Sequence, residues 1–224
     1  SSTTSCRKPS ECLLTRSTYS GIIQTIVSST SENLFSMNTP QHRQELSDRP
    51  FSRSRKERYA RQVALPGIGE PGQARLQAAR VLVVGVGGLG CPASLYMAAA
   101  GIGTIRLMDG DVVEESNLQR QILHAESDVG RRKVDTAAAR LRELNPEVNV
   151  ETYAERLAEG NASAMIEDCD FVVDATDHPA SKYLIAEACH AAGTPYSHAG
   201  VSEFMGQTMT VLQGESCCIR CVFD

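Results

Sequence analysis

The sequence lacks a long apolar run, an excess of basic residues and a regular cysteine framework. No uninterrupted apolar segment approaches the ~18 residues that span a bilayer, so we expect no membrane association. The net charge of −5 argues against a dedicated nucleic-acid-binding protein, which is usually basic overall. The 8 cysteines occur as scattered singles and one late cluster, unlike the framework of a small secreted protein. A reducing compartment such as the cytoplasm is therefore expected.

Length and composition fit one α/β domain with extensions. The chain has 224 residues, of which 42% are hydrophobic. Residues 1–36 are rich in Ser and Thr and show no sustained helical or strand period, and the first methionine is Met37. We expect 1–50 to form a disordered or non-native extension, with an organelle transit peptide as the alternative, and 51–224 to form the functional domain.

Strands and helices alternate from Arg80 onward. Strands are expected at 80–85, 104–108, 148–153, 170–174 and 195–201, and helices at about 88–100, 131–144, 161–167 and 179–192. This alternation predicts an α/β fold of the Rossmann-like, doubly wound kind, with a mostly parallel sheet and right-handed crossovers. Residues 204–213 alternate in polarity and predict an antiparallel C-terminal extension of the sheet.

A glycine-rich turn follows the first expected strand. Gly85, Gly87, Gly88 and Gly90 let the backbone pass close to a phosphate, and the next helix directs N–H groups toward it. Asp109 follows the second strand, about twenty residues later, where a carboxylate can hydrogen-bond a ribose hydroxyl. The same pattern occurs in proteins that bind dinucleotides.

Two cations beyond the turn indicate a more highly charged ligand. Arg120 ends a polar cluster with Asn117 and Gln119, and Lys133 lies in the first turn of a helix, where a cation is unfavourable unless it binds an anion. The carboxyl ends of parallel strands converge on one crevice, so Asp177 should lie there too. Its carboxylate can hold Mg²⁺ or, alternatively, cap the following helix. We therefore predict a nucleoside triphosphate site.

Cys218 and Cys221 have the spacing of half a zinc site. A tetrahedral site needs four ligands, so one such pair is weak evidence. A missing second pair, an unused pair of thiols and a redox pair all stay open.

In their order along the chain, these motifs resemble the ThiF/MoeB/HesA family, relatives of the ubiquitin-activating enzymes. The match begins near Tyr59 and continues to the last residue. The motifs that carry it are Arg58-Tyr-Ala-Arg-Gln62, Gly85-Val-Gly-Gly-Leu-Gly90, Asp109-Gly-Asp111, Ser116-Asn-Leu-Gln-Arg-Gln121, Val129-Gly-Arg-Arg-Lys133, Asn145-Pro146, Asp174-Ala-Thr-Asp177 and Cys218-Ile-Arg-Cys221.

The resemblance implies adenylation of the C-terminal glycine carboxylate of a small ubiquitin-like sulfur-carrier protein of the molybdopterin or thiamine type. ATP and Mg²⁺ would be used, pyrophosphate would be released, and the enzyme would be a homodimer. The nucleotide-binding residues implied are Gly85, Gly87, Gly88, Gly90, Asp109, Asp111, Ser116, Asn117, Leu118, Gln119, Arg120, Lys133, Asp177 and His178. Those expected to act in catalysis are Arg61, reaching into the neighbouring subunit, with Arg120, Lys133 and Asp177. Asp177 would bind Mg²⁺, and Cys218 with Cys221 would form half of a structural Zn²⁺ site.

Three positions depart from the family pattern. His178 and Ala186 stand where Asn is usual, and Lys182 where Arg is usual, so nucleotide contacts could be weaker or the substrate divergent. The sequence ends at Asp224, before the family's second cysteine pair, and we expect an incomplete domain with impaired turnover. Three alternatives stay open: an ATP-dependent tRNA-base-activating enzyme, a dinucleotide-dependent oxidoreductase, which the two extra cations argue against, and a non-catalytic binding module.

Overall fold

The computed structural model describes the backbone of residues 53–223 and the side chains of 57–223. The extension expected at 1–50 lies outside the described residues, and so does Asp224. In chain order the main elements are α3 (Arg53–Val63), α4 (Gly69–Ala78), β1 (Arg80–Val84), α5 (Gly90–Ala100), β2 (Thr104–Met108), α6 (Lys133–Leu144), β3 (Asn149–Tyr153), α7 (Glu159–Ile166), β4 (Phe171–Asp174), α8 (Pro179–Ala192), β5 (Tyr196–Ser202), β6 (Met205–Val211) and α9 (Ile219–Phe223).

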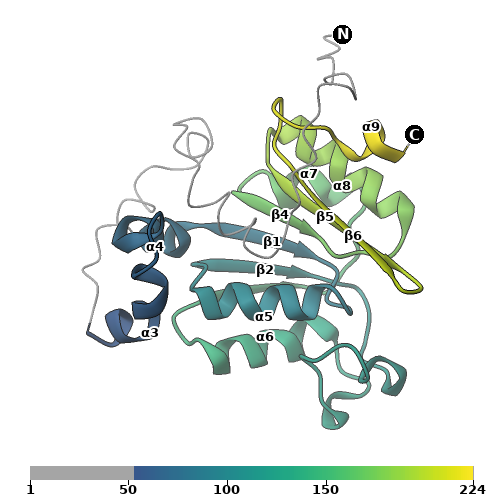
Figure 1. Cartoon of the computed structure of the whole chain (residues 1–224). Helices are drawn as coiled ribbons and strands as arrows, with labels where there is room; N and C mark the ends of the chain where they lie inside the picture. The colour runs from purple at the N-terminus through teal and green to yellow at the C-terminus, as the bar shows by residue number, and fades with distance from the viewer. Residues whose placement is uncertain (1–52, 224) are drawn as a thin grey trace.

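One six-stranded sheet with the order β3-β2-β1-β4-β5-β6 runs through the described chain. The first five strands are parallel, and β6 pairs antiparallel with β5. The chain first winds outward from β1 to β3 and then crosses to β4 on the other side, as Figure 1 shows. This is the doubly wound arrangement predicted from the sequence, including its antiparallel extension, and the prediction is confirmed.

Helices cover both faces of the sheet, which explains why β1 is apolar after Arg80. Val81 and Val83 belong to the core beneath α5 and α6, whereas Leu82 and Val84 belong to the core beneath α7 and α8. Successive side chains of a strand point to opposite faces, so a strand buried on both faces needs an unbroken apolar run. The strand direction also brings the ends of β1, β2 and β4 together, since Val84 pairs with Met108 and with Asp174.

The helices α3 and α4 pack at the end of the sheet where β2 and β3 begin. Tyr59 on α3 is buried, and its hydroxyl accepts a hydrogen bond from Asn145 Nδ2 at 2.8 Å. The same amide donates to Ala98 O at 2.7 Å. A Cβ at Gly101, whose φ is +83°, would lie 2.6 Å from the Tyr59 ring. Two of the motifs found in the sequence therefore hold α3 against the C-terminal ends of α5 and α6. The sequence analysis did not predict α4.

Candidate nucleotide-binding site

The glycine turn joins β1 to α5 at the carboxyl end of the sheet. Gly85 has a φ of +93°, and a Cβ there would lie 2.8 Å from Ala175 O. A Cβ at Gly90 would lie 1.9 Å from Gly85 O. These two glycines are required because the turn folds tightly against itself and against the end of β4. Gly87 and Gly88 instead face side chains of the loop that follows β2, and a Cβ at Gly88 would lie 3.5 Å from Arg120 Cδ.

Asp109, the residue after β2, is hydrogen-bonded to the glycine turn. Its Oδ2 accepts a hydrogen bond from Val86 N at 2.7 Å, and its Oδ1 accepts one from Asp111 N at 2.8 Å. Each oxygen keeps a second lone pair. The carboxylate therefore orients the glycine turn and retains the capacity to accept a bond from a ribose hydroxyl.

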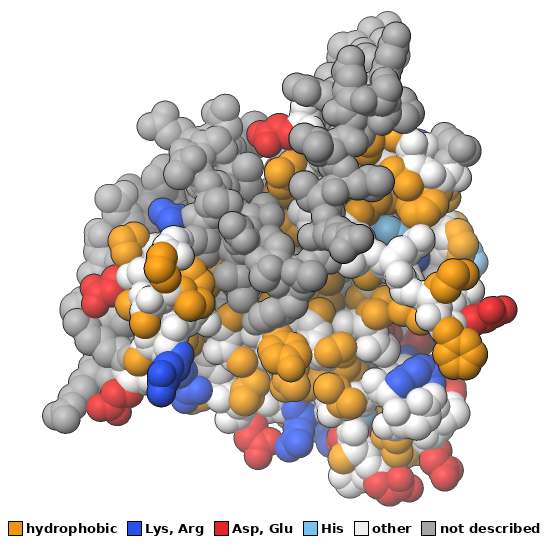
Figure 2. Space-filling model, viewed as in Figure 1, with side chains coloured by type: hydrophobic (Ala, Val, Ile, Leu, Met, Phe, Trp, Pro, Cys, Tyr) orange, Lys and Arg blue, Asp and Glu red, His pale blue; other side chains and the backbone are white. Residues whose placement is uncertain are grey.

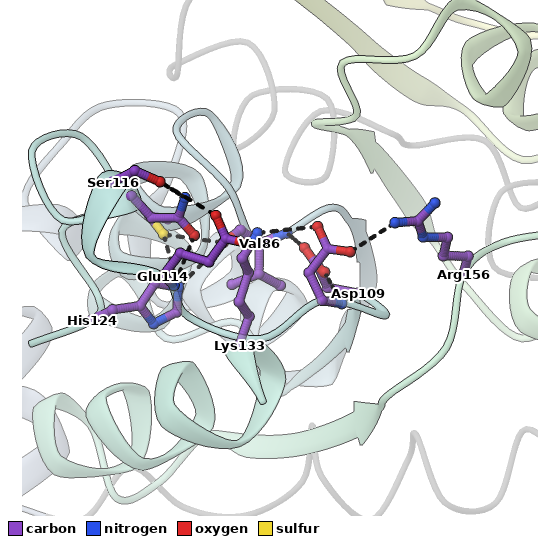
Figure 3. A network of polar contacts seen from close by, with 10 residues as sticks. Val86, Asp109, Glu114, Ser116, His124, Lys133 and Arg156 are labelled. Carbon is purple, nitrogen blue, oxygen red and sulfur yellow. Dashed lines mark hydrogen bonds and ion pairs between the residues drawn. The ribbon is translucent and has the colours of Figure 1, made fainter. Parts of the chain in front are cut away.

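Lys133 begins α6 and extends toward the same edge of the sheet (Figure 3). Its side chain is 8% exposed, and Nζ lies 3.2 Å from Asp111 Oδ2. The other oxygen of Asp111 lies 2.9 Å from Arg156 Nη2, in the loop after β3. The hydrogen bond from Arg156 is the main cause that lowers the pKa of the Asp111 carboxyl; burial opposes it, and Lys133 adds to it. A buried ammonium, a carboxylate and an exposed guanidinium thus form one chain of charges.

A buried polar cluster lies beneath the turn. His124 Nε2 is 3.4 Å from Val86 O (Figure 3). Its Nδ1 is 2.8 Å from Thr136 Oγ1. Cys91 Sγ donates to the same Val86 oxygen at 3.4 Å. Burial lowers the pKa of His124 and raises that of Cys91 to about 11, so both groups are neutral near pH 7. The cluster links the turn to the first turn of α6.

In the segment between β2 and α6, some residues stabilise the local backbone and others are exposed to solvent. Asn117 is buried, and its Oδ1 accepts a bond from Glu114 N at 3.2 Å, which fixes a single 3₁₀ turn (Glu115–Asn117). Ser116 O accepts a bond from Arg120 Nη1 at 3.0 Å, yet the Arg120 side chain is exposed. Leu118 donates to the turn through its backbone N–H, which bonds Glu115 O at 3.1 Å. The exposed guanidinium of Arg120 lies next to Gly88 and can meet an anion there.

Gln121 is a site residue that the sequence analysis quoted within a motif but did not select. It is 4% exposed, and its Oε1 has no hydrogen-bond partner among the described residues. A Cβ at Gly87 would lie 3.7 Å from its Nε2. A buried amide oxygen without a partner needs an explanation, and its place beside the glycine turn makes Gln121 a candidate for ligand contact. Its burial could not be derived from the sequence.

The loop after β4 places Asp177 at the same edge of the sheet. His178 is the N-cap of α8, and its Nδ1 accepts a bond from Ala180 N at 3.3 Å. The cap alternative for Asp177 is therefore wrong. Asp177 is exposed, and its charge acts on Arg156. His178 thus fills the N-cap role in this chain, a role for which Asn is also a preferred residue.

The other two departures from the family pattern contact protein groups. Lys182 Nζ lies 3.1 Å from Asp174 Oδ2 and donates to Ala199 O at 2.7 Å. His198 Nδ1 lies 2.9 Å from the same Asp174 oxygen. Burial has the largest single effect on the pKa of Asp174 and raises it, but the bond from His198, the charge of Lys182 and further bonds together lower it. Ala186 packs in the apolar core beneath α8.

Three predicted residues lie away from the turn. Arg61 is exposed in the last turn of α3, near the end where β2 and β3 begin. Cys218 and Cys221 lie at α9 with their sulfur atoms 3.6 Å apart. Among the described residues, no third His, Cys, Asp or Glu completes a metal site with them. Within the same part of the chain, none of the helices has the length and apolar character required to cross a membrane.

The fold and site define a nucleotide-binding protein of the doubly wound α/β class, with two cations at the loop next to its glycine turn. Residues 59–224 match the model of the ThiF family, and the chain belongs to this family.

Relatives carry more specific names. The chain is 47% identical over 183 residues to "Adenylyltransferase and sulfurtransferase uba4" of Pyricularia oryzae, with 78% of this chain and 37% of that protein covered. It is 48% identical to "Adenylyltransferase and sulfurtransferase MOCS3" of Bos taurus, with 77% and 38% covered. It is 43% identical to the "SAMP-activating enzyme E1" of Haloferax volcanii, with 75% and 62% covered. The chain thus spans little more than a third of the fungal and bovine proteins.

Two solved structures of similar fold contain ATP. The Escherichia coli MccB structure with ATP has a TM-score of 0.67 and 27% identity, over 92% of this chain and 63% of that one. The E. coli tRNA N6-threonylcarbamoyladenosine dehydratase TcdA with ATP has a TM-score of 0.62 and 30% identity, over 66% of this chain and 60% of that one. ATP binding is therefore shared by structural neighbours whose sequences are also related.

Proposed function

We propose that residues 51–224 form the adenylation domain of an enzyme that joins the C-terminal glycine carboxylate of a small ubiquitin-like sulfur carrier to the α-phosphate of ATP. Pyrophosphate is the leaving group. The observation that carries this proposal is the position of Arg120 beside Gly88, together with buried Lys133, which pairs with Asp111 where the same segment meets α6. An ordinary dinucleotide site needs no such pair of cations.

The residues of the site suit a reaction between two anions. The carrier carboxylate is already ionised at neutral pH, so no general base is required. The protein must bring the carboxylate and the phosphates together and stabilise the charge that develops on the α-phosphate and pyrophosphate. In our proposal Arg120 and Lys133 supply that charge, the turn's N–H groups bind phosphate oxygens, and Asp109 holds the ribose. The amide of Gln121 pairs with the nucleotide.

Mg²⁺ fits the chemistry of Asp177. The carboxylate is exposed at the crevice edge and is not used as a helix cap. Oxygen ligands from one or two carboxylates and the substrate phosphates are the usual set for this ion. When bound, Mg²⁺ would neutralise phosphate charge; Asp177 would hold it against the loop that begins α8.

The position of Arg61 supports a homodimer. This exposed side chain lies in the last turn of α3, away from the glycine turn of its own chain, and we propose that it serves the site of a second copy. Figure 2 shows hydrophobic side chains gathered on the outer face of α5, where Tyr96 is exposed. Such a face is suited to association between copies. A cytoplasmic location completes the proposal, in keeping with the cysteine usage.

Cys218 and Cys221 supply half of the ligands that a structural Zn²⁺ site needs. Two sulfur ligands 2.3 Å from a tetrahedral zinc ion lie about 3.8 Å apart, close to the 3.6 Å between Cys218 and Cys221. The other two ligands are not present among the described residues. We therefore expect less than one tightly bound zinc ion per chain, and metal analysis that finds one would contradict this expectation.

Exchange of labelled pyrophosphate into ATP tests the function. We expect exchange that depends on a carrier protein ending in Gly-Gly, and several carriers should be compared. In Arg120→Ala it should fall ~10²–10³-fold, as on removal of a preorganised donor. Arg140→Ala, an exposed arginine of α6 paired with Glu143, is the matched control and should retain exchange.

The alternatives give other outcomes. Exchange that requires tRNA in place of a carrier favours the tRNA-modifying reading, which rests here on the similarity to TcdA. Nucleotide binding without exchange favours a non-catalytic module. Undiminished exchange in Arg120→Ala removes this residue from the mechanism.

A further inference from the structure

The loop after β3 contributes an arginine that no motif of the sequence selects. Arg156 projects from this loop with 82% of its side chain exposed, and it meets Asp111 at 2.9 Å (Figure 3). The backbone behind it is fixed, because Asn161 Nδ2 donates to Arg156 O at 3.1 Å and Asn161 Oδ1 accepts from Ala158 N at 2.8 Å. The held backbone thus places an exposed guanidinium against Asp111.

Gly110 lets the loop after β2 approach the loop after β3 closely. A Cβ at Gly110 would lie 2.9 Å from Arg156 Cγ and 3.3 Å from Arg156 N. Any other residue at this position would push the loop after β3 away from Asp111. The negative charges of Asp109 and Asp177 also act on Arg156, more weakly than that of Asp111.

Asp111 cannot keep Lys133 as its partner if Lys133 also binds a phosphate, and Arg156 provides a second partner. Lys133 is buried and its ion-pair partner among the described residues is Asp111, which its ammonium needs while no nucleotide is bound. Once the ammonium turns to a phosphate, Asp111 loses that partner and becomes a negative charge beside the phosphates. Because Arg156 is already bonded to the other oxygen of Asp111, the carboxylate keeps a partner and its negative charge beside the phosphates stays neutralised.

We propose that Arg156 is a positioning residue that retains Asp111, so that Lys133 can exchange its carboxylate partner for a nucleotide phosphate. This inference rests on the proposed function only in that it assigns Lys133 to the phosphates. It adds a role for the loop after β3 and defines a coupled set of Lys133, Asp111 and Arg156. Arg156 acts through Asp111 and needs no contact with the nucleotide.

A double-mutant cycle on nucleotide binding tests the coupling. ATP affinity should be measured by equilibrium titration for the parent chain, Arg156→Gln, Asp111→Asn and the double variant. We expect Arg156→Gln to weaken ATP binding roughly twofold to fivefold, the upper part of the scale of an exposed ion pair, and to change it less than twofold when Asp111 is already Asn. Arg156→Lys should restore most of the loss, and Arg140→Gln on α6 should change nothing.

Adenosine separates this role from direct contact, because it has no phosphate for Lys133. Its affinity should not change in Arg156→Gln. Equal losses of ATP affinity in both Asp111 backgrounds, no loss in the parent background, or a parallel loss for adenosine would each overturn the inference. A parent chain that does not bind ATP overturns the inference and the proposed function together. If the double-mutant cycle gives the expected result but no carrier supports pyrophosphate exchange, the proposed function is refuted and the inference on Arg156 stands.

Discussion

Asp109 binds the glycine turn through Val86, whose backbone N–H donates to its Oδ2 at 2.7 Å. The sequence pattern predicted that this carboxylate binds a ribose hydroxyl, but in the structure it accepts hydrogen bonds from two backbone N–H groups. The turn between β1 and α5 is thus oriented by the end of β2. A ribose would meet a carboxylate that is already held in place, which reduces the entropy lost on binding.

Replacement of Asp109 should affect stability and binding together. In Asp109→Asn one amide oxygen replaces two acceptors, and one of the two N–H groups is left facing an NH₂ group. We expect a loss of about 1–3 kcal/mol in the free energy of unfolding, the cost of an unsatisfied donor, and weaker ATP binding. Denaturant unfolding and titration check this; Glu167→Gln at the exposed end of α7 is the control. Unchanged stability would show that the turn is held by other contacts.

Two glycines near helix starts should respond oppositely to a methyl group. A Cβ at Gly90 meets Gly85 O at 1.9 Å, whereas one at Gly160 on α7 has nothing within 4 Å. Gly90→Ala should lower the free energy of unfolding by about 2 kcal/mol or more, through backbone strain. Gly160→Ala should leave it unchanged or raise it by about 0.5–1 kcal/mol, because alanine favours a helix. Similar effects at both positions, measured by thermal unfolding, would contradict the geometry.

Removal of Lys182 should leave the buried carboxylate of Asp174 without its ammonium partner, with His198 still bonded to it. Lys182→Met is expected to cost about 3–5 kcal/mol, as for one partner removed from a buried ion pair, and Lys182→Arg considerably less. The lowered pKa of Asp174 also gives an acid dependence: this stability is present above the ordinary carboxyl pKa of 3.8 and is lost as the pH falls below it. Equal unfolding free energies for the Met and Arg variants would show that the pair contributes nothing.

His124 should give the fold a second sensitivity to acid. Burial lowers its pKa below the ordinary 6.5, so as the pH falls through 6.5 the unfolded chain binds a proton that the folded chain does not. Stability is therefore complete above this value and declines below it. Between pH 7.5 and pH 5.5 the free energy of unfolding should fall less in His124→Gln than in the parent chain. An identical fall in both would exclude His124 as the cause.

Local patterns were sufficient for most of the fold and for part of the site. The apolar run of β1, the glycines that follow it and the alternation of strands and helices predicted the sheet and the edge at which the site lies. Helix α4 was missed because it contains two glycines and a proline, residues that normally argue against a helix.

Contacts between distant segments could not be derived in this way. The pairing of Asp111 with Arg156 joins the loops after β2 and β3, and the burial of Gln121 depends on the packing of the loop against the turn. Residue type and spacing carry no information on such geometry. The same limit applies to Asp177, whose alternative as a helix cap was excluded only by the position of His178.

Equilibrium titration with ATP and NAD⁺ tests most directly whether the site is built for three linked phosphates. The account predicts that ATP binds more tightly than NAD⁺, and that Arg120→Ala and Lys133→Ala each weaken ATP far more than NAD⁺, while Arg140→Ala affects neither. Tighter binding of NAD⁺ by the parent chain, or ATP affinity unchanged in both variants, would contradict it.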